Sequence, residues 1–195
     1  MNELRIEITY RRTSRMSMRF VKNGDLHVSV PIGTSRSVVQ DFIHRNQAWI
    51  DAAGRRTTEQ QRQRRSFYDQ LPLHTREQWT DALARIKALI EPLVERNAQR
   101  MNVHPHSIGY KAITSYWGQC RVRTGDLVFS LYLLLLPEWT VEQVVVHELA
   151  HLIVPNHSPR FHAIMDQYYP NWREARREIR RVVSGTAAPD ELESD

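Results

Sequence analysis

Two histidines and a glutamate within one apolar segment are the residues best placed to do chemistry. Residues 144–152 contain His147, Glu148 and His151 among valines, leucines and alanine. On a helix, residues four apart share one face, so both imidazoles can reach one metal ion. Glu148 lies one residue further round, where its carboxylate can accept a proton from water at an open coordination position. This spacing predicts a zinc-dependent hydrolase with Glu148 as general base.

A catalytic zinc ion has three protein ligands, and His157 is the candidate for the third. Pro155 ends the helix, so the chain can turn back toward the metal. His157 is six positions after His151, which is also the metzincin spacing, but Val154 stands where metzincins have a glycine. The sequence therefore predicts the ligand set His147, His151 and His157 without assigning that clan.

The apolar residues around the H-E-x-x-H pattern strengthen the prediction of metal binding. Chance produces it in roughly a few per cent of chains with this histidine content. Burying two imidazoles and a carboxylate in an apolar helix costs several kcal/mol unless something satisfies them. A bound metal does so.

Five other residues are weaker candidates for the site. His162 is interpreted as a packed or exposed helix residue rather than one that orients a metal ligand. Packing is also favoured for Tyr168 and Tyr169 over oxyanion stabilisation, and substrate binding is the less favoured role for Arg160. Cys120 is predicted to be a small packed side chain, since three histidines already complete the ligand set.

Composition indicates a globular protein with a basic surface. The 195 residues are 41% hydrophobic and 25% charged, with a net charge of +5 and one cysteine. No segment predicts a signal peptide or a membrane span, so the expectation is a cytoplasmic protein without membrane contact. A solvated polar face is favoured for the two arginine clusters over a nucleic-acid surface. The second cluster consists of Arg173, Arg176, Arg177, Arg180 and Arg181.

The elements that must position the site can be predicted from periodicity and turn signals. Strands are expected at 4–9, 16–21 and 26–30, with a type I′ hairpin turn at Asn23-Gly24. One helix is expected over 35–50 and a long one over 75–101, opened by Thr75 and Gln78 as a capping box and kinked at Pro92. The polar stretch 52–66 fits either a helix extension or a linker. Short strands follow at 108–113, 120–122 and 127–133. A second capping box, Thr140 with Gln143, opens the zinc helix, which is expected to reach about residue 154.

The predicted fold class is α+β. A minimal zincin-like core is expected, with the zinc helix packed on a small mixed or antiparallel sheet, together with an N-terminal β-hairpin region and a long helix. The predicted divisions are an N-terminal sheet and helix at 1–51, a polar connector at 52–74, the metallopeptidase core at 75–184 and a disordered acidic tail at 185–195.

Three blocks of the sequence resemble the YgjP-like metallopeptidase domain, a relative of the SprT and WLM minimal zinc peptidases. The blocks are residues 147–152 with 156–161, residues 115–120 with Gly125 and 135–137, and more weakly the early hairpin with Trp49-Ile50. The resemblance implies zinc held by His147, His151 and His157, with Glu148 as general base. It also implies that Trp117 and Gly118 lie on the strand bordering the cleft.

The favoured function is therefore a zinc metallopeptidase that acts on a peptide or protein substrate. The strand near 128–133 is expected to be an edge that holds an extended peptide by main-chain pairing. Two alternatives remain: a nucleotide phosphohydrolase using the same metal, and a peptidase docked on DNA by its arginine-rich helix. The sequence leaves the oligomeric state open.

Overall fold

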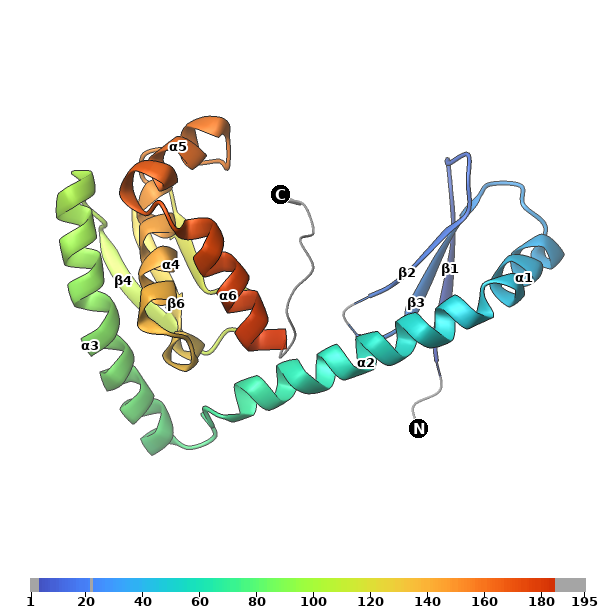
Figure 1. The fold of residues 1–195 in the computed structure, drawn as a ribbon, viewed down its shortest axis with the longest axis horizontal. Helices are drawn as coiled ribbons and strands as arrows, with labels where there is room; N and C mark the ends of the chain where they lie inside the picture. Colours follow the sequence, from blue (N-terminus) through green and yellow to red (C-terminus); the bar gives the residue numbers. More distant parts are fainter. Residues whose placement is uncertain (1–3, 22, 185–195) are drawn as a thin grey trace. The chain divides into compact units, whose positions relative to one another are not determined.

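A computed structural model describes residues 4–21 and 23–184 of the chain (Figure 1). Two compact units divide the chain between Gln63 and Arg64. The predicted connector, 52–74, spans this division, and the predicted tail, 185–195, lies outside the described residues. None of the helices in the described ranges combines the length and the apolar character needed to cross a bilayer.

The first unit contains a three-stranded sheet and helical segments. Its elements are β1 (Ile6–Arg11), β2 (Ser17–Phe20), β3 (Leu26–Pro31), α1 (Arg36–Arg45) and most of α2 (Gln47–Asp69). The strand order is β1-β3-β2, with β1 parallel and β2 antiparallel to β3. Alternate residues of β3 are fully buried and form a small core. This core consists of Leu26, Val28, Val30, Val39 and Ile50.

The predicted hairpin is present as the β2–β3 pair, but its turn is not type I′. Gly24 has φ +91°. In a type I′ hairpin with Asn23 and Gly24 as its two central residues, the Gly24 N–H would not close the turn. The Gly24 N–H instead donates to Val21 O, and the Val21 N–H donates to Asp25 O. Gly24 thus closes the turn and is not one of its two central residues.

The single helix expected over 35–50 is divided at Asn46. Its backbone N–H turns back to the carbonyls of Ile43 and His44, and its side chain donates to Phe42 O at 2.7 Å. Asparagine competes for local backbone groups in this way and weakens continuous helix. The polar stretch 52–66, left open by the sequence, lies within α2.

The second unit contains a small mixed sheet, three long helices and the shorter helices that join them. Its elements are α3 (Arg76–Met101), β4 (Ser107–Lys111), β5 (Gly118–Arg121), β6 (Asp126–Ser130), the 3₁₀ helix η1 (Leu131–Leu135), α4 (Glu138–Ala150), α5 (Pro159–Tyr168) and α6 (Trp172–Ser184). The strand order is β4-β6-β5, with β4 parallel and β5 antiparallel to β6. The α+β class and the small mixed sheet are as predicted. The strand expected at the edge, β6, is central instead.

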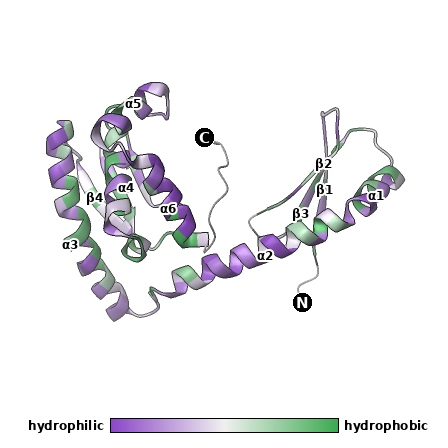
Figure 2. Ribbon diagram, in the orientation of Figure 1, coloured by the Kyte–Doolittle hydropathy of each residue, from purple (hydrophilic) through white to green (hydrophobic). Residues whose placement is uncertain are grey.

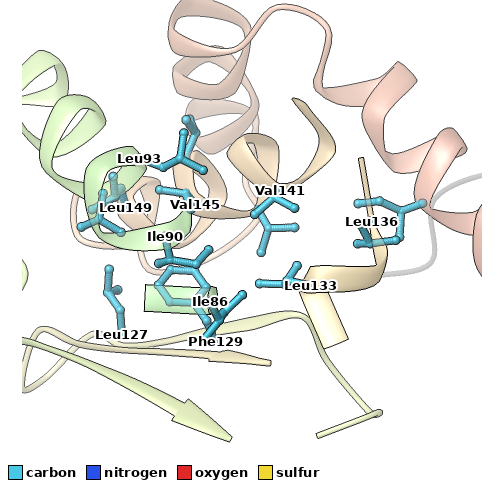
Figure 3. Packing of buried hydrophobic residues seen from close by; sticks show 14 of the residues in the cluster. Ile86, Ile90, Leu93, Leu127, Phe129, Leu133, Leu136, Val141, Val145 and Leu149 are labelled. Carbon is cyan, nitrogen blue, oxygen red and sulfur yellow. The ribbon is translucent and has the colours of Figure 1, made fainter. Parts of the chain in front are cut away.

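A continuous core joins the helices of this unit to the sheet (Figure 3). Ile86 and Ile90 of α3 and Val145 and Leu149 of α4 lie around Phe129 of β6, all of them fully buried. Each such side chain contributes about 1.5–3 kcal/mol by its removal from water. The helix that contains the H-E-x-x-H pattern is therefore fixed on both sides, by α3 and by the sheet.

The helix ends agree only in part with the capping signals. Thr75 caps α3 as predicted, with the reciprocal bonds between Thr75 and Gln78 both present, and α3 continues through Pro92. The capping box expected at Thr140 is wrong, because α4 begins earlier, at Glu138. The Thr140 hydroxyl donates to Pro137 O at 2.7 Å inside the first turn. The helix also ends earlier than expected, at Ala150, and residues 151–153 form turns.

Candidate metal centre and active site

The three predicted histidines come together at the end of α4. Their ligand nitrogens all lie within 4.8 Å of one another, and the Nε2 atoms of His147 and His157 are 3.1 Å apart. His147 is in the last turn of α4, and His151 is the residue that caps it. The chain then reverses before α5 and brings His157 back to the same point. In the described part of the chain, this cluster is the one group of three or more candidate metal ligands.

The donor set fits a metal ion that prefers nitrogen ligands. Burial, reinforced by the nearby charges of His151, His157 and Arg176, lowers the pKa of His147 to about 3. Burial also lowers the pKa of His151. Both rings are therefore neutral at pH 7, with a lone pair available for a metal. The Nδ1 atom of His151 lies 3.2 Å from Val154 O, and donation to that carbonyl leaves Nε2 as the ligand atom.

An aromatic ring closes the apolar side of the histidine cluster. Phe161, on α5, is 1% exposed, and its ring centroid is 4.7–4.9 Å from those of all three histidines. The neighbouring His162 stacks on Trp172 at 5.3 Å with an interplanar angle of 9°. His162 therefore belongs to the wall of the site, while its ring is held by an aromatic partner rather than by the histidine cluster.

Glu148 is adjacent to His147 in the chain, and its carboxylate fits against β5 because residue 118 is a glycine. The side chain is 5% exposed, and a Cβ atom on Gly118 of β5 would lie 2.6 Å from its Cγ and Oε1 atoms. Burial raises the pKa of Glu148 to about 8, opposed by a hydrogen bond from the backbone N–H of Cys120. A glycine inside a strand is the sequence signal for such a close approach.

A pocket of about 410 Å³ opens in front of Glu148 and His147. One wall is formed by the start of β5 and the residues before it, Tyr116 to Gly118, as the resemblance implied for Trp117 and Gly118. Helix α6 also contributes to the lining. Its lining residues include Trp172, Arg176 and Arg180, so two arginines interpreted as part of a solvated face border the site instead.

Three of the weaker candidates lie elsewhere. Of the described residues that line the pocket, none is Arg160, Tyr168 or Tyr169. Both tyrosine side chains are partly buried and pack against the core of this unit, as predicted. The Tyr169 hydroxyl also donates to Trp139 O at 2.6 Å.

The end of α2 holds the segment that leads into β5. Arg64 and the Tyr68 hydroxyl both donate to Thr114 O. The Tyr68 ring lies 6.2 Å from Trp117 and 4.8 Å from Tyr132, measured between centroids. An aromatic cluster thus supports the pocket wall from behind, which no local sequence pattern indicated.

Cys120 lies on β5, half-buried behind the pocket wall. Burial, with a smaller contribution from Glu148, raises the pKa of its thiol to about 11. Its backbone N–H, rather than its sulfur, serves the site by donating to Glu148. The side chain packs against the core of the unit, as predicted.

Comparison with known proteins gives one family. The family model described as YgjP-like, metallopeptidase domain, matches residues 70–182, which include all three histidines and Glu148. The crystal structure of the metallopeptidase zymogen of Pyrococcus abyssi abylysin is 20% identical to this chain, with a TM-score of 0.41. The match covers 44% of this chain and 87% of that one. A search of curated proteins found no match.

Proposed function

The chain belongs to the YgjP-like metallopeptidase family, and from this we propose a zinc peptidase in which Glu148 is the general base. Membership in this family implies a metal ion, and His147, His151 and His157 are the residues that would hold it. The observation that carries the proposal is the convergence of these three rings beside a buried glutamate at the floor of a pocket.

Zinc is proposed because of the chemistry of the donors. The candidate ligand atoms are imidazole nitrogens, which suit zinc, whereas magnesium and calcium prefer sets of oxygen ligands. Three protein ligands leave a position open, as catalytic zinc sites do. When bound, zinc supplies a Lewis acid that acidifies water and polarises the peptide carbonyl.

The protein's own contribution to the reaction centres on Glu148. Its carboxylate is buried beside His147, and its raised pKa lets it hold a proton near neutral pH. Glu148 would take a proton from the attacking water and release it to the leaving amine. The space provided by Gly118 and the N–H of Cys120 fix the carboxylate against β5 while it does so.

The substrate is proposed to bind along β5. This strand is at the edge of its sheet and borders the pocket, whereas β6 is paired on both sides. An extended peptide can add to such an edge through main-chain hydrogen bonds. The sequence predicts peptide binding along 128–133. We propose β5 instead, because β6 is the central strand of the sheet.

The proposal is tested by digestion of an unstructured protein with zinc-loaded enzyme. We expect the wild type to produce fragments and Glu148→Gln to be slower by about 10²–10⁴-fold, which is the usual contribution of a general base. Products are identified by mass, and zinc content is measured in both proteins. Glu138→Gln is the matched control, because Glu138 is exposed in the first turn of the same helix.

Two results would contradict this proposal. Full activity of Glu148→Gln with zinc bound would remove Glu148 as the base. No cleavage by wild type with zinc bound would contradict peptidase action on unstructured chains.

A further inference from the structure

Two arginines of helix α6 line the pocket, and two others form ion pairs outside it. Arg176 and Arg180 line the pocket together with Trp172. The three residues are spaced four apart, so they lie along one face of the helix. Figure 2 shows α6 to be mostly hydrophilic, and it is anchored by Trp172 and Ile179, which are 3% and 6% exposed.

The remaining charged groups of α6 show how the helix divides its arginines. Arg173 pairs with Asp166 at 2.7 Å and lies over the Trp172 ring, with its Cζ atom 4.2 Å from the ring centroid. Arg181 pairs with Glu178 at 2.6 Å. Arg173 and Arg181 are thus held by ion pairs, and Arg176 lies over the Trp172 ring with its Cζ atom 6.0 Å from the ring centroid. Arg180 is an exposed cation in the pocket lining.

The pocket has an excess of positive charge at the place where a substrate must lie. Among the described residues that line it, Glu148 is the one carboxylate, and that side chain is buried against β5. Arg176 and His147 both line the pocket, so the guanidinium group lies in the same concave site as the candidate metal ligand. A concave site lined by one sign of charge attracts and orients the opposite sign.

We propose that Arg176 and Arg180 form a carboxylate-binding wall that selects peptides with a carboxylate a few residues from the scissile bond. The inference rests on the proposed peptidase function and names its substrate class. A guanidinium group offers paired N–H donors that match the two oxygens of a carboxylate. The carboxylate can belong to an acidic side chain or to the C-terminus of the peptide.

The pocket geometry limits how far the selected group can be from the reacting bond. A pocket of about 410 Å³ holds only a few side chains, and an extended chain advances about 3.3 Å per residue. A peptide lying along β5 with its scissile bond at the histidines would share this pocket with α6. Its side chains near that bond would therefore meet Arg176 and Arg180.

The test uses matched short peptides that differ in one carboxylate. One pair has glutamate or glutamine at the same internal position, and a second pair ends in a free acid or an amide. Cleavage is measured as kcat/KM with zinc-loaded wild type. Binding is measured separately with zinc-loaded Glu148→Gln, from the tryptophan fluorescence of a site that includes Trp117 and Trp172. The internal pair and the terminal pair distinguish the two sources of the carboxylate.

We expect the acid member of at least one pair to bind more tightly and to be cleaved faster, by about tenfold. Arg180→Gln and Arg176→Gln should each reduce this preference about two- to fivefold, as for exposed ion pairs. Arg180→Glu should reverse it, so that the glutamine or amide member of the pair is preferred. Arg177→Gln is the control, because Arg177 is exposed on the same helix outside the pocket lining.

The outcomes separate the inference from the function on which it rests. Cleavage of both members of each pair at equal rates would overturn the carboxylate wall and leave the peptidase intact. Selective binding of acid peptides, lost in Arg180→Gln but without any cleavage by wild type, would support the wall and contradict peptidase action. If the preference for the acid peptide persisted in both Arg176→Gln and Arg180→Gln, residues other than these arginines would cause it, and the proposal would be overturned.

Discussion

At Gly118, the absence of a side chain leaves room for the carboxylate of the proposed base, Glu148. The carboxylate of Glu148 occupies the space that any Cβ on residue 118 would need. Gly118 is not among the glycines with positive φ, so its backbone does not require a glycine. The requirement comes from Glu148, which must lie against β5 to face the pocket.

We expect Gly118→Ala to lower kcat/KM by about 10²-fold, because the new methyl group would displace the glutamate by the order of 1 Å. The matched control is Gly109→Ala on β4, where the nearest atoms to a new Cβ are 3.8 Å away. Peptide cleavage, zinc content and circular dichroism are compared for both variants. Equal activity of the two variants would show that the contact at residue 118 does not fix the base.

The sequence predicted part of this site well because that part is local. His147 and His151 are one helical turn apart, and Pro155 is close enough to return His157 to them. The positions of Arg176 and Arg180 depend on how α6 docks beside α4, about thirty residues later in the chain. Charge composition alone favours solvent for such residues, so periodicity could not separate them from their neighbours.

At the scale of elements, the last turns of α2 support the pocket wall. Arg64 and Tyr68 hold the carbonyl of Thr114, and the Tyr68 ring packs between Trp117 and Tyr132. Residues 112–117 are otherwise a connection between β4 and β5. The helix therefore positions a segment whose residues Tyr116 and Trp117 line the pocket.

Tyr68→Ala is expected to destabilise the second unit by roughly 2 kcal/mol, less than the 3–5 kcal/mol of a fully buried aromatic ring. It should also raise KM, because Trp117 loses its support. Tyr68→Phe keeps the ring packing and should remain close to wild type, since Arg64 still donates to Thr114 O. Urea unfolding and peptide cleavage measure the two effects. An equal loss of stability and an equal rise in KM in both variants would show that the Tyr68 hydroxyl, rather than its ring packing, is responsible.

Most elements could be predicted from period and capping, but their order in the sheet could not. β6 has the sequence of an apolar strand. Its two edges pair with β4 and β5, and its Leu127 and Phe129 side chains are buried in the core shared with α3 and α4. Strand order is a long-range property that alternation does not encode. The start of α4 was misplaced for a local reason, since Thr140 and Gln143 have the spacing of a capping box inside a helix that Pro137 already begins.

At the scale of the whole molecule, the chain builds two separate cores. One contains five fully buried residues between Leu26 and Ile50, and the other extends from Phe67 to Ile179. The two clusters share no residue. The candidate metal ligands and the pocket belong to the second unit. The stability of each unit should therefore respond differently to the metal.

We expect calorimetry of the full chain to show two unfolding transitions, with zinc raising the midpoint of only one. At a free zinc concentration a hundred times the Kd, the gain is about 2.7 kcal/mol of unfolding free energy for the unit that binds. A chelator should return that midpoint to its original value. The His147→Ala variant is the control, and it should lose the shift. A single transition that moves as a whole would contradict the division.

The half-buried thiol behind β5 has a consequence for the chemical durability of this protein. Alkylating and oxidising reagents attack the thiolate, and a thiol whose pKa is about 11 is almost entirely protonated at pH 7. Cys120 is therefore protected from these reagents by the protonation of its thiol as well as by its partial burial. An enzyme built this way should keep its activity in iodoacetamide or mild peroxide, conditions that silence peptidases whose nucleophile is a cysteine.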